Sequence, residues 1–199
     1  MSEAAGETST TQGRPRSERA RQAILAAASE LLARDGFAAV TVEAIAAHAG
    51  VSKATIYRWW PNKAAVVTES FLERSAPQIE FAATESVREN LRVQMRRLVQ
   101  LLAGTSGQVI AALMAEAQSD AEVARAFLAG WVAVRRRETR AVLERGVANG
   151  ELRADLDLDV VMDALYGPIY FRLLAHHLPL DEVFVDRLAD HVLNGLSTR

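Results

Sequence analysis

Apolar side chains recur every three to four positions along most of the chain, the spacing that places them on one face of an α-helix. Nowhere do apolar and polar residues alternate strictly over six or more positions, as they would along a half-buried β-strand. Residues 1–13 are mostly polar and lack the helical pattern, so we expect a disordered N-terminal arm. The pattern therefore predicts an all-α protein that follows this arm.

Capping residues and helix breakers divide the pattern into nine predicted helices. Ser, Thr, Asp and Asn mark helix N-termini, whereas Gly and Pro mark the ends. Ser119 is interpreted as the cap of the long seventh helix, and Pro168 is expected to kink the eighth. The predicted helices span approximately residues 17–35, 41–50, 52–59, 62–76, 87–103, 108–118, 120–148, 158–177 and 181–196.

Residues 41–59 have the features of two short helices that meet at a sharp turn. Gly50 can adopt the positive φ that such a corner requires, and Ala46 is small enough to let the helices approach closely. Ile56 and Trp59 are predicted to face the interior. This is helix-turn-helix geometry, in which the second helix enters the major groove of DNA. We therefore predict double-stranded DNA as a partner.

The run from Thr41 to Lys63, TVEAIAAHAGVSKATIYRWWPNK, resembles the DNA-binding signature of the TetR family of transcriptional regulators. The resemblance is continuous over about residues 17–70, and the number and lengths of the later helices also fit this family. It implies a nine-helix TetR-like fold with two domains. A helix-turn-helix DNA-binding domain is expected over residues 14–63, and an effector-binding and dimerisation domain over residues 64–199.

The charge distribution agrees with this division. Residues 14–63 contain eight Lys and Arg against four Asp and Glu, whereas the chain from residue 64 onward contains 15 against 19. The net charge of the whole chain is −2. A small basic unit on an acidic body can still bind the phosphate backbone of DNA, so the overall charge does not exclude a nucleic-acid partner.

The resemblance implies specific DNA contacts. Tyr57 and Lys63 are expected to contact phosphates, and Lys53, Thr55 and Arg58 are candidates for contacts with base edges. Arginines that precede the helix-turn-helix unit could reach the backbone or the minor groove, or could form a solvated arm that attracts DNA without specificity. The predicted DNA-binding set is Arg14, Arg16, Thr41, Ser52, Lys53, Ala54, Thr55, Tyr57, Arg58 and Lys63, and Arg19 and Arg21 are further candidates near the arm.

Thr41 and Ser52 have two candidate roles. Their hydroxyls are expected to cap the N-termini of the two short helices. The resemblance also implies that they contact phosphates, and a helix N-terminus favours anions because its first N–H groups are unpaired. Capping alone is the alternative.

The fifth to eighth helices are implied to enclose a pocket for a small-molecule effector. Methionine adapts its shape and aromatic rings pack flat against apolar ligands, although ordinary core packing is the alternative for each such residue. The candidate lining residues are Met95, Leu98, Met114, Phe127, Trp131 and Tyr166. The arginines at positions 135, 136, 137 and 140 are interpreted as a solvated face of the seventh helix, and an anion-binding role is the alternative.

The eighth predicted helix is apolar on nearly every face and must therefore be covered on both sides. TetR-like proteins commonly dimerise through their last two helices, so the resemblance implies a homodimer. The alternative is that the same residues fill only the core of one chain. The predicted interface comprises Val161, Leu165, Ile169, Leu173, Phe184, Leu188, Val192 and Leu196.

Composition narrows the remaining function classes. The absence of Cys excludes disulfide scaffolds, thiolate metal sites and thiol nucleophiles. The longest apolar run, residues 109–115, is far shorter than a membrane span requires, and the N-terminus does not have the pattern of a secretory signal. We therefore expect a cytoplasmic protein without a membrane partner.

An enzyme is the alternative class, such as a helical-bundle metalloprotein with Glu-x-x-His ligand pairs. None of the four His has a carboxylate three residues before it, so we predict no enzymatic activity, no metal and no cofactor. The predicted function is a ligand-responsive regulator, expected to be a repressor released from a palindromic operator by a small apolar effector. An activator of transcription, or an architectural protein that binds DNA of any sequence, would also carry a helix-turn-helix unit of this kind.

Overall fold

The computed structural model describes residues 13–82 and 86–196, with side chains from Ser17 onward. The predicted arm, except for its last residue, and the side chains of Arg14 and Arg16 lie outside this description. The regular elements within the described residues are all helices, which confirms the predicted fold class. They are α1 (Gly13–Ala39), α2 (Val42–Ala49), α3 (Lys53–Tyr57), α4 (Lys63–Ser75), the 3₁₀ turn η1 (Ala76–Gln78), α5 (Val87–Leu102), α6 (Thr105–Glu116), α7 (Ala121–Phe127), the π-helical turn η2 (Leu128–Val132), α8 (Ala133–Ala148), α9 (Leu158–Ala175) and α10 (Glu182–Leu196).

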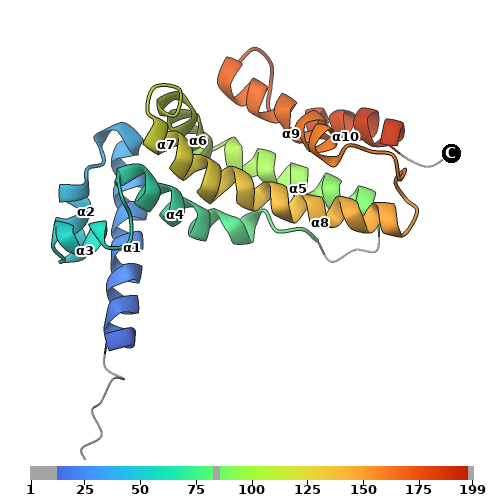
Figure 1. Cartoon of the computed structure of the whole chain (residues 1–199). Helices are drawn as coiled ribbons and strands as arrows, with labels where there is room; N and C mark the ends of the chain where they lie inside the picture. The colour runs from blue at the N-terminus through green and yellow to red at the C-terminus, as the bar shows by residue number, and fades with distance from the viewer. Residues whose placement is uncertain (1–12, 83–85, 197–199) are drawn as a thin grey trace, which may run out of the picture.

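The helices form a small end unit and a longer body (Figure 1). The end unit consists of α2 and α3 packed beside α1, and α4 leads from this unit into the body. Within the body, α5 packs against α8 on one side and α10 on another, and α9 also contacts both α8 and α10. Because α7, η2 and α8 follow one another without a break, the described part of the chain contains nine α-helices in all, as predicted.

Local capping fixes the end unit. The Thr41 hydroxyl accepts the N–H of Ala44 at 3.1 Å at the start of α2, and the Ser52 hydroxyl accepts the N–H of Thr55 at 3.2 Å at the start of α3. Gly50 ends α2 with φ at 65°, in the left-handed region that favours glycine. The capping roles and the turn predicted from sequence are therefore confirmed.

The predicted cap of the seventh helix is wrong by one residue. Asp120, not Ser119, caps α7, because its carboxylate accepts the N–H groups of Glu122 and Val123 at 2.7 and 3.1 Å. The Ser119 hydroxyl instead donates to the carbonyl of Glu116, the last residue of α6, at 3.2 Å. The predicted end of the first helix is confirmed, because Gly36 leaves the helical conformation with φ at 76°, and a short helical segment follows this kink to Ala39.

The core is continuous between the end unit and the body. Ile24, Ile45 and Ile56, one from each of α1, α2 and α3, are fully buried together. In the body, Leu91 of α5 and Leu165 of α9 are fully buried as well. Burial of each such side chain contributes roughly 1.5–3 kcal/mol, so the end unit is held mainly by apolar contacts.

A regular series of polar pairs fastens α10 to α5. Side chains four residues apart on α5 face side chains four residues apart on α10, in antiparallel order. Arg96 and Asp186 form two parallel bonds of 2.7 Å each. The pairs are Arg88–Asn194, Arg92–Asp190, Arg96–Asp186 and Gln100–Glu182. They flank a buried stripe of α10, so this helix belongs to the core of the single chain.

Within residues 13–82 and 86–196, no helix is by itself long and apolar enough to cross a membrane. Only α5 and α6 taken together meet the requirement of length and composition, and they are bent by 86° relative to each other.

Candidate nucleic-acid interface and effector cavity

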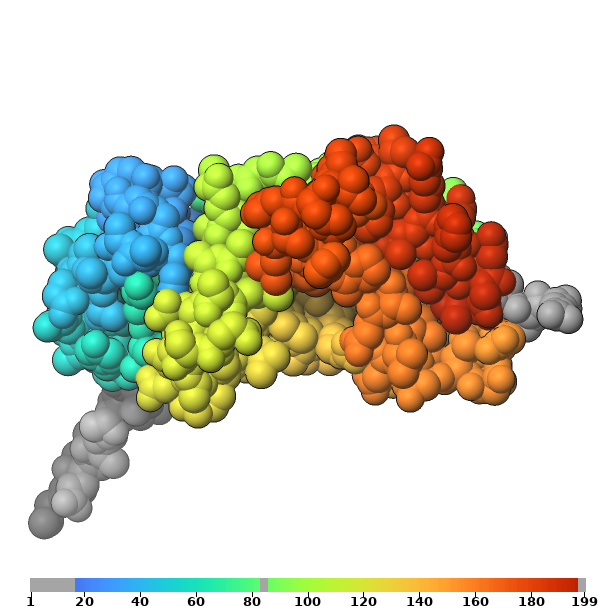
Figure 2. Space-filling view, turned by 90° about the horizontal axis from the view of Figure 1, so that it is seen from above, coloured from blue at the N-terminus to red at the C-terminus, as the bar shows by residue number. Residues whose placement is uncertain are grey.

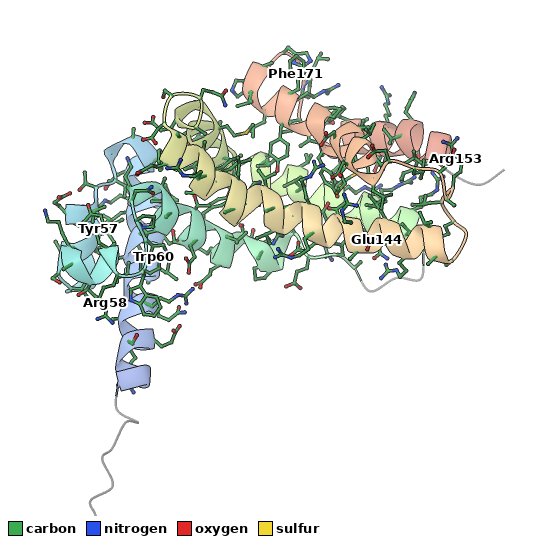
Figure 3. All side chains as sticks on the ribbon, viewed as in Figure 1. Tyr57, Arg58, Trp60, Glu144, Arg153 and Phe171 are labelled. Atoms are coloured by element: carbon green, nitrogen blue, oxygen red, sulfur yellow. The ribbon has the colours of Figure 1, made fainter. Side chains whose placement is uncertain are left out.

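The outer face of α3 carries the candidate DNA contacts. Ile56 is fully buried beneath it, whereas Lys53, Ala54, Tyr57 and Arg58 are exposed. Figure 3 shows Tyr57 and Arg58 at the end of the molecule, away from the body. The predicted residues at positions 53, 54, 57 and 58 therefore share one accessible surface, while Thr55 is half-buried at its edge.

Trp60, not Trp59, faces the interior. Trp60 is 3% exposed and its Nε1–H donates to the Glu69 carboxylate of α4 at 2.6 Å, whereas Trp59 is 42% exposed. The prediction for Trp59 is therefore wrong. The chain continues to turn after α3, with the N–H of Trp60 bonded to the carbonyl of Ile56. Trp60 follows the buried Ile56 by four residues, and this spacing was the signal in the sequence that both side chains share the inner face.

Both lysines of the predicted DNA-binding set have partners within the chain. Lys53 donates to Glu43 of α2 at 2.9 Å, and this hydrogen bond lowers the pKa of the Glu43 carboxyl. Lys63 donates to the carbonyl of Phe37 at 3.0 Å and lies 4.3 Å from the centre of the Phe37 ring. Burial lowers the pKa of Lys63. Lys63 therefore ties α4 to the end of α1, and its phosphate contact stays a prediction.

The remaining candidates near the end unit differ in accessibility. The hydroxyls of Thr41 and Ser52 are exposed at helix N-termini while they cap them, so phosphate contact stays a prediction for both. Arg19 is exposed on α1. Arg21 is held by Glu18, Glu69 and Glu73, so a contact with DNA requires it to leave these carboxylates and stays a prediction. Arg14 and Arg16 belong to the undescribed side chains.

A cavity of about 250 Å³ lies in the body between α5, α6, the α7–α8 helix and α9. Five of the six predicted lining residues border it: Leu98, Met114, Phe127, Trp131 and Tyr166. Met95 is fully buried in the core but is not among the lining residues, so its prediction is corrected. Other lining residues are Gln94, Val132, Arg135, Arg136, Thr139, Met162, Asp163, Gly167 and Tyr170.

The polar part of this cavity includes arginines for which the sequence left anion binding as the alternative role. Arg135 was interpreted as solvated, yet its side chain is 13% exposed and borders the cavity, where its guanidinium carbon lies 5.8 Å from the centre of the Trp131 ring. Arg136 forms ion pairs with Asp159 and Asp163 of α9. The four arginines of this helix had no distinguishing local signal, because their environment depends on the position of α9.

Polar side chains of the cavity form two hydrogen-bonded pairs. Tyr166 donates to the Gln94 carbonyl at 2.8 Å, and Trp131 donates through Nε1 to the Tyr170 oxygen at 2.9 Å. Burial raises the pKa of both tyrosines, that of Tyr170 to about 12. Both phenols are therefore neutral at physiological pH.

The cavity wall also touches the helix that leads to the end unit. The rings of Trp131 and of Phe71 in α4 have centroids 5.3 Å apart. Beside them, a Cβ added at Gly130 would lie only 2.7 Å from the Thr68 Cγ2 atom of α4. Thus the π-helical turn η2 lies against α4 on one side and supplies Trp131 to the cavity on the other.

Helix α9 has an inner and an outer apolar face. Val161, Leu165, Ile169 and Leu173 are at most 6% exposed and pack in the core of the single chain. This corrects the prediction that these four form a dimer interface, because a partner cannot reach them. The half-exposed α10 residues of that prediction, Phe184, Leu188, Val192 and Leu196, remain available.

The outer face of α9 is an exposed stripe with alternating spacings of four and three residues. It comprises Val160, Ala164, Gly167, Phe171 and Leu174, which we call the α9 stripe. Val160 is 63% and Phe171 62% exposed. Figure 3 shows Phe171 at the outer edge of the molecule. The sequence contained this spacing, but a helix that is apolar all round does not reveal which of its faces remains open.

The described part of the chain brings together no group of three His, Cys, Asp or Glu side chains that could hold a metal ion. It has instead an exposed recognition helix on a helical body that encloses an apolar cavity. These features define the class as helix-turn-helix transcriptional regulators, which bind DNA and respond to small molecules.

The family follows from the comparison with known proteins. The model described as "Bacterial regulatory proteins, tetR family" matches residues 24–69, and "Tetracyclin repressor-like, C-terminal domain" matches residues 81–192. The chain belongs to the TetR family of transcriptional regulators. The resemblance inferred from residues 41–63 is thereby confirmed, and the comparisons lend no support to the enzyme alternative.

Proteins similar to this chain match it over nearly its whole length. The HTH-type transcriptional regulator YdeS of Bacillus subtilis is 41% identical over 92% of this chain and 91% of its own. The DNA-binding transcriptional repressor TetR of Mycobacteroides abscessus is 32% identical over 89% of this chain and 94% of its own. The crystal structure of the TetR family regulator SCO0332 has a TM-score of 0.82 at 33% identity and covers 90% of this chain and 100% of its own.

A more distant structural neighbour contains a bound ligand. The transcriptional regulator FadR from Bacillus subtilis, solved in complex with stearoyl-CoA, has a TM-score of 0.65 at 22% identity and covers 88% of this chain and 98% of its own. At this identity the likeness concerns the fold alone.

Proposed function

We propose that two copies of the chain bind a palindromic DNA operator as a repressor in the cytoplasm and leave it when a small apolar effector enters the cavity. The single observation that carries this proposal is the arrangement of α4, which joins the exposed recognition unit to the wall of the cavity. The relative in Mycobacteroides abscessus that is named a DNA-binding transcriptional repressor supports the direction of control.

DNA contacts are assigned to the exposed surface of α3 and to the helix ends around it. Tyr57 and Arg58 project from this surface, and their side chains form no hydrogen bond or ion pair with the described residues, which suits close approach to a groove. To contact DNA, Lys53 must leave its ion pair with Glu43. This costs little free energy because both side chains are exposed. An Arg that binds guanine contributes about 1–3 kcal/mol of discrimination against other bases.

Dimerisation is assigned to the α9 stripe together with the half-exposed side chains of α10. Figure 2 shows, from above, that α9 and α10 lie together over the part of the body away from the helix-turn-helix unit. The small residues Ala164 and Gly167 at the centre of the stripe allow another helix to approach closely. A second copy would cover this apolar face and hold two recognition helices about 34–36 Å apart, the spacing of successive major grooves.

Release is assigned to a movement of α4. An effector that spreads the wall at Trp131 pushes on Phe71, because the two rings are in contact. Asn62, the residue that caps α4, donates to Glu122 of α7 at 3.2 Å and gives the two helices a second contact near the recognition unit. The effector shifts the equilibrium only by its difference in affinity for the two conformations, for which about 1–3 kcal/mol is typical.

Selection of binding sites from a random duplex library with the purified chain tests the proposal. A selected palindrome with half-sites about one helical turn apart is expected. Arg58→Ala should weaken binding to this palindrome by about 10- to 100-fold, since it removes a charged contact to DNA. Arg137→Ala, which removes an exposed arginine on α8, is the matched control and should leave binding unchanged.

Two results would contradict the proposal. Equal affinity for random and selected duplexes would indicate a sequence-tolerant architectural protein. Loss of binding in Arg58→Ala together with a lowered free energy of unfolding would place Arg58 in a structural role instead.

A further inference from the structure

We propose that the cavity binds a small apolar monocarboxylate, whose carboxylate is held by the Arg135 guanidinium and the Tyr170 hydroxyl. This inference rests on the proposed function, in which the cavity is the effector site. It goes further by naming the chemical class of the effector and the groups that select it.

Arg135 has unused hydrogen-bonding capacity beside the cavity. Its Nε atom is buried and has no partner among the described residues, and its Nη2 atom donates to Glu138 at 3.1 Å. A buried charged donor without an acceptor costs free energy, and native structures rarely leave one unmatched. An anionic oxygen in the cavity would supply the missing acceptor.

Tyr170 provides a second donor. Its oxygen accepts the Trp131 N–H, so its own O–H proton is not used in that bond, and the described residues give it no acceptor. The other phenol differs, because Tyr166 spends its proton on Gln94. The raised pKa of Tyr170, about 12, keeps its phenol protonated and able to donate.

The charged side chains around Arg135 and Tyr170 favour binding of an anion over a cation. Asp163, the carboxylate that borders the cavity, is bound by Arg136, which also pairs with Asp159. Glu138 pairs with Arg135 and is 41% exposed, so water screens it. An ammonium group would therefore meet only carboxylates that already have cationic partners, whereas a carboxylate would meet an unused charged donor.

The size and walls of the cavity define the rest of the ligand. Leu98, Met114, Phe127 and Met162 form apolar walls from four different parts of the body. The volume of about 250 Å³ lies below the roughly 300–1,000 Å³ of pockets for drug-sized ligands. An arylalkanoic or medium-chain acid fits this space, whereas a long-chain acyl-CoA does not fit without expansion.

Isothermal titration calorimetry with matched probes tests the inference at neutral pH. The acids are benzoate, 3-phenylpropionate and octanoate, and each is compared with its amide, while 3-phenylpropylamine serves as the cation. At least one acid should bind about 10- to 100-fold more tightly than its amide, the range expected for charged hydrogen bonds. The amine should bind more weakly than the amide.

Variants locate the selectivity within the cavity. Arg135→Gln should reduce the affinity for the acid to that for its amide and leave the affinity for the amide unchanged. Arg135→Lys retains the charge and should keep part of the preference for the acid over its amide. Tyr170→Phe should lower the affinity for the acid by about 3- to 10-fold. Arg137→Gln, an exposed arginine on the same helix, is the matched control and should behave as the native chain. Circular dichroism confirms that each variant is folded.

The outcomes separate this inference from the proposed function. Failure of every acid to bind, equal affinity for acid and amide, preference for the amine, or an unchanged acid affinity in Arg135→Gln each overturns the inference. If a neutral amide binds and releases the selected DNA while the acids do not, the cavity is the effector site but the ligand class is wrong. If an acid binds as expected but no operator is selected, the ligand class stands and the proposed function fails.

Discussion

Trp60 fixes the end of the recognition helix through both its ring and its N–H group. The ring is buried next to the helix-turn-helix core, and Nε1 donates to Glu69 of α4 at 2.6 Å. Glu69 also accepts from Arg21 of α1, so one carboxylate connects three segments of the end unit. The position of α3 relative to α4 therefore depends on a few specific side chains as well as on apolar burial.

Replacing Trp60 by Phe tests this connection. The variant keeps an aromatic ring but loses the hydrogen bond to Glu69 and some buried area, and we expect the free energy of unfolding to fall by about 1–3 kcal/mol. Urea denaturation followed by circular dichroism measures the change. Trp59→Phe makes the same exchange at an exposed position and should change stability by less than about 0.5 kcal/mol. Equal losses in the two variants would contradict the assigned role.

Residues with local signals were predictable from the sequence, and residues with distant partners were not. Thr41 and Ser52 cap helices that begin right after them, so their roles depend only on neighbouring positions. Arg135 differs, since its environment is built by Trp131 on its own helix and by the tyrosines of α9. Nothing within a few residues of Arg135 distinguishes it from the exposed Arg137.

At the scale of helices, the π-helical turn η2 lies between the cavity and α4 and contacts both. A π-helical turn inserts one extra residue into a helix and is frequent at functional sites. Here it allows Gly130 to approach Thr68 closely while Trp131 lies against Phe71. Thr68 is 1% exposed, so this contact is well inside the molecule.

Gly130→Ala should destabilise the chain because the new methyl group would lie 2.7 Å from Thr68 Cγ2. We expect a loss of about 1–3 kcal/mol, as for other overpacked sites. Adding Thr68→Ala removes the opposing methyl group and should restore most of the loss. A double-mutant cycle from urea denaturation measures the interaction between the two positions.

Gly195→Ala is the control for the intrinsic effect of the substitution. Position 195 lies in α10 with nothing within 4 Å of an added Cβ, so alanine should stabilise the helix by up to about 1 kcal/mol. If Gly130→Ala were as stabilising as Gly195→Ala, the close approach of η2 to α4 would be refuted.

The ion pair between α5 and α10 predicts a dependence of stability on pH. Hydrogen bonds from Arg96 lower the pKa of Asp186 in the folded chain below its unfolded value of about 4. The stabilisation is therefore fully present above that value and is lost as the pH falls through the folded pKa. Denaturation at pH 7, 5, 4 and 3 should show a smaller loss of stability in Asp186→Asn than in the native chain. An identical loss would show that the pair contributes nothing.

The positions of the helices were predictable from the sequence, but which face of each helix is buried was predictable only in part. Periodicity and caps located all nine helices because both signals are local. The turn η2 has no such signal, since a π-helical turn keeps nearly the same apolar spacing as the α-helix around it. Likewise, α9 is apolar on both sides, and only its packing in the fold shows that Leu165 is inside and Phe171 outside.

At the scale of the whole molecule, the candidate DNA-binding helix, the cavity and the candidate dimer surface occupy different parts of the structure. The recognition helix lies at one end, the cavity lies in the body, and α9 and α10 cover one side of the body away from that end (Figures 1 and 2). A dimer built on that surface leaves both recognition helices free. Dimerisation and DNA contact can therefore be tested by separate substitutions, because α9 packs mainly against α5, α6, α8 and α10 and not against α3.

Phe171→Glu should produce a folded monomer that binds the selected palindrome at least 10-fold more weakly. A carboxylate within the apolar interface would lose its hydration without gaining a partner. Analytical ultracentrifugation measures the mass, and fluorescence anisotropy with labelled duplex measures the affinity. Leu128→Glu exchanges a similarly exposed apolar side chain, 55% against 62%, on the α7–α8 helix and should remain dimeric.

Leu165→Glu completes the comparison between the two faces of α9. Leu165 is fully buried in the single chain, so its replacement by a carboxylate should unfold the protein rather than separate two folded copies. A dimer that persists unchanged in Phe171→Glu would move the interface away from the α9 stripe. A folded monomer in Leu165→Glu would instead return the interface to the inner face, against the burial that this structure gives it.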